Sequence, residues 1–215
     1  MRQYASRYGD AMDTDADDDA DDHLARALCA MIAEDEAVRT RLAADGSLFA
    51  GYHPVMAAVH RANAARLREL VAAHGWPGRS RVGDEAADAA WRIVQHAIGE
   101  PDFQRAMLPV IERAVAAGEL PARAAAMLDD RIRAFEGRPQ RYGTQYDWSD
   151  DGAAMVPIGG VEDAHEVDTR RAAVGLPPIE WRRPPPADQP PPRDPVARRA
   201  EAEAWLVEVG WRPRR

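Results

Sequence analysis

Apolar residues recur at the three- and four-residue spacing of an amphipathic helix in five stretches of the chain. We predict helices over residues 23–44, 54–74 and 84–98, and two more that begin at Pro101 and Pro121. Before Tyr142, β-branched and aromatic residues do not alternate over any run long enough for a strand. The pattern therefore predicts an all-α fold, with a single domain of about five main helices.

The fifth predicted helix is followed by the segment richest in polar recognition groups, G-R-P-Q-R-Y-G-T-Q-Y-D-W at residues 137–148. Gly137 and Pro139 are the pair of residues that ends a helix and prevents it from resuming. We therefore expect an irregular polar loop or a short hairpin after the fifth helix. A short helix closed by Gly175 should follow it.

Composition divides the chain into four segments. Residues 1–22 read as an acidic disordered tail, because clustered aspartates with few apolar residues cannot support packing. Residues 23–181 form the helical domain, and residues 182–195 form a proline-rich linker of extended polyproline type. The last segment, 196–215, holds a final helix that could dock back onto the domain or bind a protein partner.

Charge excludes several functions. The formal net charge is −8, but eight Asp and two Arg in residues 1–22 account for −6 of it, which leaves −2 for the rest. A nearly neutral body has no basic field for nucleic acid, so we expect no nucleic-acid partner. All 28 basic residues are arginine, which excludes a Schiff-base lysine and a P-loop lysine.

The single Cys29 cannot form an intramolecular disulfide, and the chain begins without an apolar signal region. No apolar run is long enough to span a membrane, so we expect no membrane partner. The expected location is cytoplasmic.

Polar residues interrupt the apolar stripes of three predicted helices at Asn63, Gln95 and Arg131, and His96 lies at the edge of the third helix. A buried amide or guanidinium needs partners, so these side chains either cross-link helices or face a pocket. We hypothesise that they converge with the following loop on a small polar ligand, acidic or peptide-like. The ligand-binding residues in this hypothesis are Asn63, Gln95, Asp130, Gln140, Thr144 and Gln145.

If the site is catalytic, His96 is the best candidate for general acid and base, because an unperturbed imidazole titrates near neutral pH. Arg131 would pair with a carboxylate or a developing oxyanion, and Tyr142 would help to orient the substrate. Hydrolysis or acyl transfer fits these roles. The alternative is a non-catalytic interaction or regulatory module, in which the same polar residues fix the geometry of the loop.

A metal site or other cofactor is not expected from the sequence. None of the six histidines belongs to an H-x-x-x-H or H-E-x-x-H pair. His53 and His60 share a helix face but lie about 10 Å apart by helical rise. The acidic tail lacks the glycine turn and the final Glu of a calcium loop.

Five motifs in combination resemble a bacterial family known only as a domain of unknown function, frequent in high-GC genomes. The resemblance covers roughly residues 24–179 and implies no reaction. The acidic tail and the proline-rich end lie outside it. The motifs are G-W-P-G-R-S-R-V-G, V-Q-H-A, the pair Asp130-Arg131, G-R-P-Q-R-Y-G-T-Q and V-D-T-R-R-A-A-V-G-L-P-P.

Overall fold

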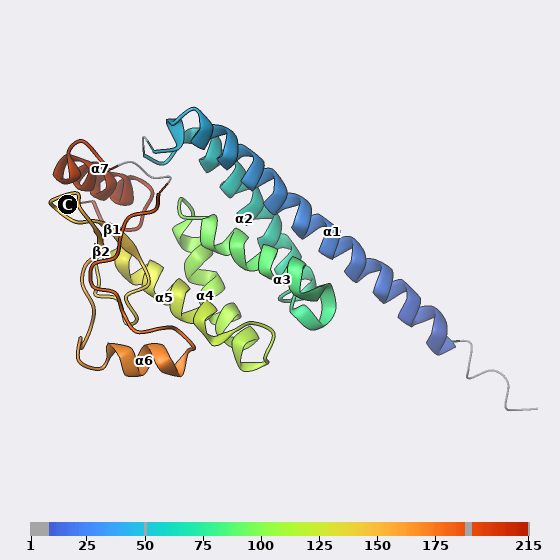
Figure 1. Ribbon diagram of the computed structural model, residues 1–215. Coiled ribbons are helices and arrows are strands. Elements are labelled where there is room, and N and C mark those ends of the chain that lie inside the picture. Colours follow the sequence, from blue (N-terminus) through green and yellow to red (C-terminus); the bar gives the residue numbers. More distant parts are fainter. Residues whose placement is uncertain (1–8, 50, 188–190, 215) are drawn as a thin grey trace, which may run out of the picture.

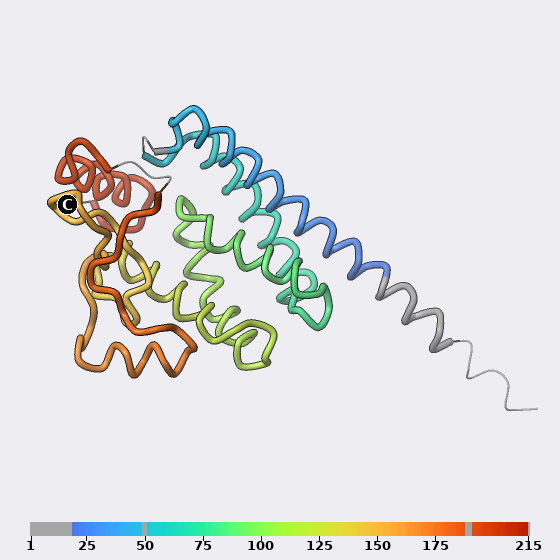
Figure 2. Tube along the Cα trace, viewed as in Figure 1, coloured from blue at the N-terminus to red at the C-terminus, as the bar shows by residue number. Residues whose placement is uncertain are grey.

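The computed structural model describes residues 9–49, 51–187 and 191–214, whose arrangement is shown in Figures 1 and 2. The all-α prediction is confirmed in outline, but the described residues form seven α-helices rather than about five, with one small two-stranded sheet. In order, the elements are α1 (Gly9–Ala44), η1 (Ser47–Phe49), α2 (Pro54–His74), α3 (Arg79–His96), α4 (Pro101–Ala116), α5 (Ala122–Glu136), β1 (Tyr146–Trp148), β2 (Met155–Pro157), α6 (Val167–Ala173) and α7 (Pro195–Glu208).

The long helix α1 lies along α2 and α3 on one side of the molecule (Figure 1). It begins at Gly9 rather than at the predicted His23, so part of the acidic segment expected to be disordered is helical. Residues 1–8 of that segment lie outside the described residues.

Helix α3 spans Arg79–His96, but the non-helical Gly83 separates its first turn from the regular helix, which begins at Asp84 as predicted. The carboxylate of Glu119 accepts hydrogen bonds from the Ser80 backbone N–H at 3.0 Å and from the Ser80 hydroxyl at 2.7 Å. A carboxylate at this position satisfies the free amides of the first turn. Gly83, with φ of 79°, then breaks the helix locally before it continues.

The core forms where the apolar faces of α1 to α5 meet, and Leu206 of α7 and Trp211, which follows α7, add to it. Its most deeply buried large side chains include Leu28, Leu67, Ile93, Phe103 and Leu128. None of the helices in the described ranges is apolar enough over a sufficient length to cross a bilayer.

Gly137 ends α5 as the sequence predicts. Its φ of 79° and ψ of 19° are left-handed, and its N–H bonds to the Ala134 carbonyl at 3.2 Å. We expect Gly137→Ala to lower the free energy of unfolding by about 1–2 kcal/mol, because a Cβ is disfavoured in this backbone region. Urea denaturation measures the loss. Gly137→Asn is the control and should lose less, since Asn tolerates the left-handed conformation; equal losses would contradict this explanation.

The predicted hairpin follows the polar loop. Strands β1 and β2 pair antiparallel, with Trp148 opposite Met155. Met155 also exchanges two backbone hydrogen bonds with Arg183, so the start of the proline-rich linker is tied to the hairpin. Residues 188–190 of that linker lie outside the described residues.

Helix α7 docks back onto the domain, one of the two outcomes expected for the final helix. Leu206 and the following Trp211 are buried. The Trp211 indole N–H donates to the Ile98 carbonyl at 2.7 Å, and Arg212 Nε donates to the Phe135 carbonyl at 2.9 Å. The C-terminal segment therefore contacts the chain just after α3.

Candidate functional site

Three helices bring Asp35, His60 and His96 together. Asp35 comes from α1, His60 from α2, and His96 is the last residue of α3. One ligand atom from each of these residues lies within 4.8 Å of the other two. Among the described residues, this is the one group of three His, Cys, Asp or Glu side chains that meets such a distance limit.

Asp35 lies at the centre of the cluster and is 1% exposed. Its Oδ2 lies 3.1 Å from His60 Nε2 and 3.1 Å from His96 Nδ1. Burial raises the pKa of the Asp35 carboxyl, but its interactions with the two neighbouring imidazoles outweigh burial and hold the pKa well below its usual value. The carboxylate is therefore ionised and faces two imidazoles at once.

His60 is buried, and its two ring nitrogens have different neighbours. Nδ1 lies 2.8 Å from the hydroxyl of Tyr52, which precedes α2. Nε2 lies close to Asp35, but its bonding direction misses the carboxylate, so it forms no hydrogen bond with the described residues.

His96 forms the exposed edge of the cluster, with 29% of its side chain accessible. Nδ1 lies 3.1 Å from both carboxylate oxygens of Asp35. The other ring nitrogen has no hydrogen-bond partner in the part of the chain that the structure describes. Solvent can therefore reach the cluster from the His96 side.

Two imidazoles and a carboxylate form a common ligand set for a divalent transition metal. Tetrahedral zinc with bonds of about 2.0–2.1 Å separates neighbouring ligand atoms by about 3.3 Å. The two 3.1 Å separations around Asp35 are close to this spacing. Small side-chain movements would thus place three ligands around one ion and leave further coordination positions open.

Asp35 and Tyr52 were not predicted as site residues from the sequence, and His60 was considered only together with His53. Three ligands from three helices leave no short motif. One signal was available: Asp35 lies seven residues after Leu28 and seven before Leu42, which are both buried, so a charge interrupts the core-facing stripe of α1.

Asp130 holds the loop that follows α5. It is fully buried and accepts hydrogen bonds from the backbone N–H groups of Arg141, Tyr142 and Thr144, at 2.7, 3.0 and 2.9 Å, and from the Thr144 hydroxyl at 3.0 Å. Burial raises the pKa of the Asp130 carboxyl, and these hydrogen bonds act in the opposite direction. Its acceptor positions are therefore engaged by the chain itself.

Gln140 and Gln145 link the same loop internally. The Gln140 amide donates to the Gln145 and Ile158 carbonyls, both at 2.8 Å, and accepts from the Gln145 N–H at 2.8 Å. The Gln145 amide donates to the Thr144 hydroxyl at 3.0 Å. These contacts favour the structural alternative for both glutamines.

Arg131 connects α5 to the loop and to the end of α3. Its Nε donates to Gln145 Oε1 at 2.9 Å, and its NH1 group donates to the Gln95 carbonyl. Burial lowers the pKa of Arg131 to about 10. Asp129 pairs with Arg133 and Asp102 pairs with Arg105, so neither carboxylate is the partner of Arg131. The carbonyl end of α3 partly compensates the Arg131 charge instead.

The other predicted residues are spread over the domain. Asn63 donates to the Met31 carbonyl at 3.3 Å, so it cross-links α2 to α1. The Arg141 guanidinium lies over the Tyr142 ring, with its central carbon 5.8 Å from the centroid of that ring. The Gln95 amide is buried, and neither of its polar atoms bonds to a described residue. Of the predicted residues, only His96 belongs to the Asp35 cluster.

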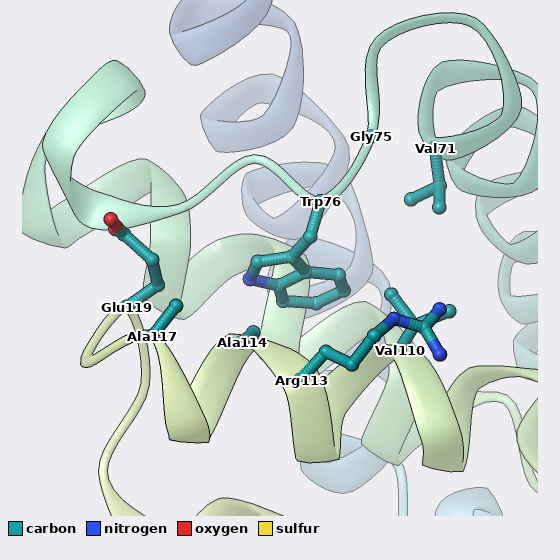
Figure 3. A pocket seen from close by; sticks show the side chains of 8 residues that line it. All are labelled: Val71, Gly75, Trp76, Val110, Arg113, Ala114, Ala117 and Glu119. Atoms are coloured by element: carbon teal, nitrogen blue, oxygen red, sulfur yellow. The ribbon is translucent and has the colours of Figure 1, made fainter.

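Two cavities occur away from the cluster. One of about 340 Å³ is lined by Trp76, from the segment between α2 and α3, and by Arg113 of α4 and Glu119 (Figure 3). The other, of about 480 Å³, lies beside Gly99. Neither is lined by His96, Arg131 or the loop glutamines, so these cavities do not support the predicted His/Arg/Gln pocket.

Comparison with known proteins assigns no activity. The model of a family of unknown function, DUF6624, matches residues 22–183. Searches of the curated proteins and of the solved structures found no match. The matched range includes all three members of the cluster and excludes α7.

Proposed function

Because the chain belongs to the DUF6624 family, whose function is unknown, we propose a function from the geometry of the cluster. The chain binds one divalent transition metal ion of the zinc class through Asp35, His60 and His96. It uses this ion to hydrolyse a small polar substrate, acidic or peptide-like. The observation that carries the proposal is the convergence of three ligand-type side chains, from three helices, on one position with an accessible side.

Alignment favours metal binding over a purely hydrogen-bonded cluster. A structural cross-link would place both imidazole N–H groups in line with the buried carboxylate. His60 Nε2 is near enough to Asp35 for a hydrogen bond but is poorly directed. His96 Nδ1 does hydrogen-bond to Asp35, so only the direction of His60 Nε2 favours metal binding on this ground. Zinc exceeds iron and manganese in its usual affinity for such ligands.

Three protein ligands leave at least one position for water, as in catalytic zinc sites. A bound zinc ion lowers the pKa of that water to about 7, which supplies a nucleophile at neutral pH. Asp35, His60 and His96 would hold the ion, and the ion would supply an activated water for hydrolysis of a carbonyl bond. In this proposal His96 is a metal ligand rather than the general base that the sequence analysis favoured.

The residues around the polar loop support this site from a distance. Arg131, Gln145 and the Gln95 carbonyl tie the loop and α5 to the end of α3, immediately before His96. Asp130 and Gln140 hold the loop itself. Their proposed role is to fix the position of α3, not to touch substrate.

A second candidate function is a non-catalytic interaction module. The observation that favours it is the saturation of the loop by its own hydrogen bonds, in particular the four made to Asp130. In that case Asp35 would be a buried cross-link between α1, α2 and α3 and would bind no ion.

Metal titration tests the proposal. Protein stripped with a chelator should bind one Zn²⁺ or Co²⁺ per chain, and metal at a hundred times its dissociation constant should stabilise the fold by about 2.7 kcal/mol. Stoichiometry is measured by native mass spectrometry and stabilisation by thermal melting, with Fe²⁺, Mn²⁺ and Ca²⁺ for comparison. His60→Gln and His96→Gln should lose binding.

The matched control is His74→Gln, because His74 is exposed at the end of α2 and lies outside the cluster. It should bind metal as the wild type does. Absence of binding by the wild-type chain, or equal binding by the His60 and His96 variants, would rule out this metal centre and favour the interaction module.

A further inference from the structure

The geometry points to a role for the C-terminal helix α7 in the metal centre. We propose that Tyr52 is a positioning residue for His60, and that Trp205 of α7 holds Tyr52 in place. This inference rests on the proposed metal site. It adds that the metal affinity depends on a helix outside residues 22–183, which the family model matches. The C-terminal segment of this chain would thereby set the metal affinity.

The contact between Tyr52 and His60 fixes which nitrogen of the imidazole can bind metal. An imidazole that ligates through Nε2 carries its proton on Nδ1. That N–H then donates to the Tyr52 hydroxyl, 2.8 Å away. Ligating histidines commonly donate their second N–H in this manner, which fixes the tautomer and the ring orientation. The two rings also stack, with centroids 5.7 Å apart.

Tyr52 is held from two further sides. A Cβ on Gly99 would lie 2.9 Å from Tyr52 Cε1, so this glycine permits a close approach that no other residue would allow. Trp205 packs edge-on against the Tyr52 ring, with centroids 5.1 Å apart. Tyr52 therefore sits between His60, the segment after α3, and α7.

The same helix is anchored beside His96. Trp211 hydrogen-bonds the Ile98 carbonyl, two residues after His96, and packs against Phe135 at 5.3 Å between centroids. Trp205 contacts the same Phe135 ring at 6.4 Å. The C-terminal segment thus reaches one histidine through Tyr52 and the other through Ile98. Displacing α7 would loosen both ligands without removing either.

Metal affinity tests the inference. Tyr52→Phe keeps the ring and removes the hydroxyl, so Co²⁺ and Zn²⁺ should bind about 10- to 100-fold more weakly, the usual effect of losing such a partner. Trp205→Ala should weaken binding in the same direction, and Trp205→Phe should restore part of it by keeping an aromatic edge. Affinity is measured by competition with a chromophoric chelator, and ligand geometry by the visible spectrum of bound Co²⁺.

The matched control is Trp181→Ala, because Trp181 is 46% exposed and belongs to neither contact. Its affinity and Co²⁺ spectrum should equal those of the wild type. Circular dichroism checks that each variant is folded. If Trp205→Ala does not fold, Tyr52→Phe is the decisive variant. Wild-type affinity and spectrum in the folded Tyr52 and Trp205 variants would overturn this inference alone. A wild-type chain that binds no metal would overturn the proposed function as well.

Discussion

Asp130→Ala is expected to lower the free energy of unfolding by about 3–5 kcal/mol, the usual range for removing one partner of a buried charged interaction. The carboxylate accepts hydrogen bonds from three positions of the loop, through the backbone N–H groups of Arg141, Tyr142 and Thr144. Alanine leaves these donors without their acceptor, and each buried donor left unsatisfied costs about 1–3 kcal/mol. Partial exposure of the loop to water keeps the total below the simple sum.

Urea denaturation with two variants separates this explanation from a general effect of charge. Asp130→Asn keeps one acceptor oxygen and should lose less than the alanine variant. Asp129→Ala removes only the pair with Arg133, four residues away on the same helix, and should lose under about 1 kcal/mol. Similar losses in Asp129→Ala and Asp130→Ala would show that the loop does not depend on the buried carboxylate.

The helix ends that depend on neighbouring residues could be predicted from the sequence. Helix α2 has the predicted bounds, with Pro54 at its start and Gly75 after its end. Gly137 ends α5 in the left-handed conformation expected of it. The chain supplies these signals within a few residues, so no knowledge of the fold is needed to use them.

Helical turns that depend on distant residues could not be predicted from the sequence. The turn that precedes the predicted start of α3, residues 79–82, is stabilised by the carboxylate of Glu119, after α4. No property of the sequence around Arg79 reveals that partner. The stabilising contact exists only once α3 and α4 are packed.

The candidate site shows the same limit more strongly. Periodicity places Asp35 and His60 on the inner faces of their helices, but the rotation and height of one helix relative to another come from packing. His96 was recognised as a candidate without the carboxylate beside it. The polar loop was more conspicuous in the sequence, yet its side chains bond mainly to one another and to the ends of helices. Local polarity identified a structural network more readily than the buried cluster.

Asp35→Asn should reduce the affinity for zinc by more than about 100-fold, equivalent to about 2.7 kcal/mol of binding free energy. Loss of a group that only supports a metal ligand already lowers metal affinity by about 10- to 100-fold. Asp35 is itself a proposed ligand and lies beside both histidines. Asparagine has nearly the same volume, so packing at this buried position is kept. What disappears is the negative charge that balances the ion.

Zinc affinity and metal-free stability are measured on the same Asp35→Asn protein, because the two candidate functions predict different patterns. For a metal centre, affinity falls sharply and thermal stabilisation by zinc is lost. For a hydrogen-bonded cross-link, the metal-free protein is destabilised and zinc affects neither chain. The control is Glu36→Gln, the next residue, which pairs with Arg92 outside the cluster and should keep wild-type affinity. A wild-type affinity in Asp35→Asn would remove the carboxylate from the site, and two imidazoles alone would not account for a bound zinc ion.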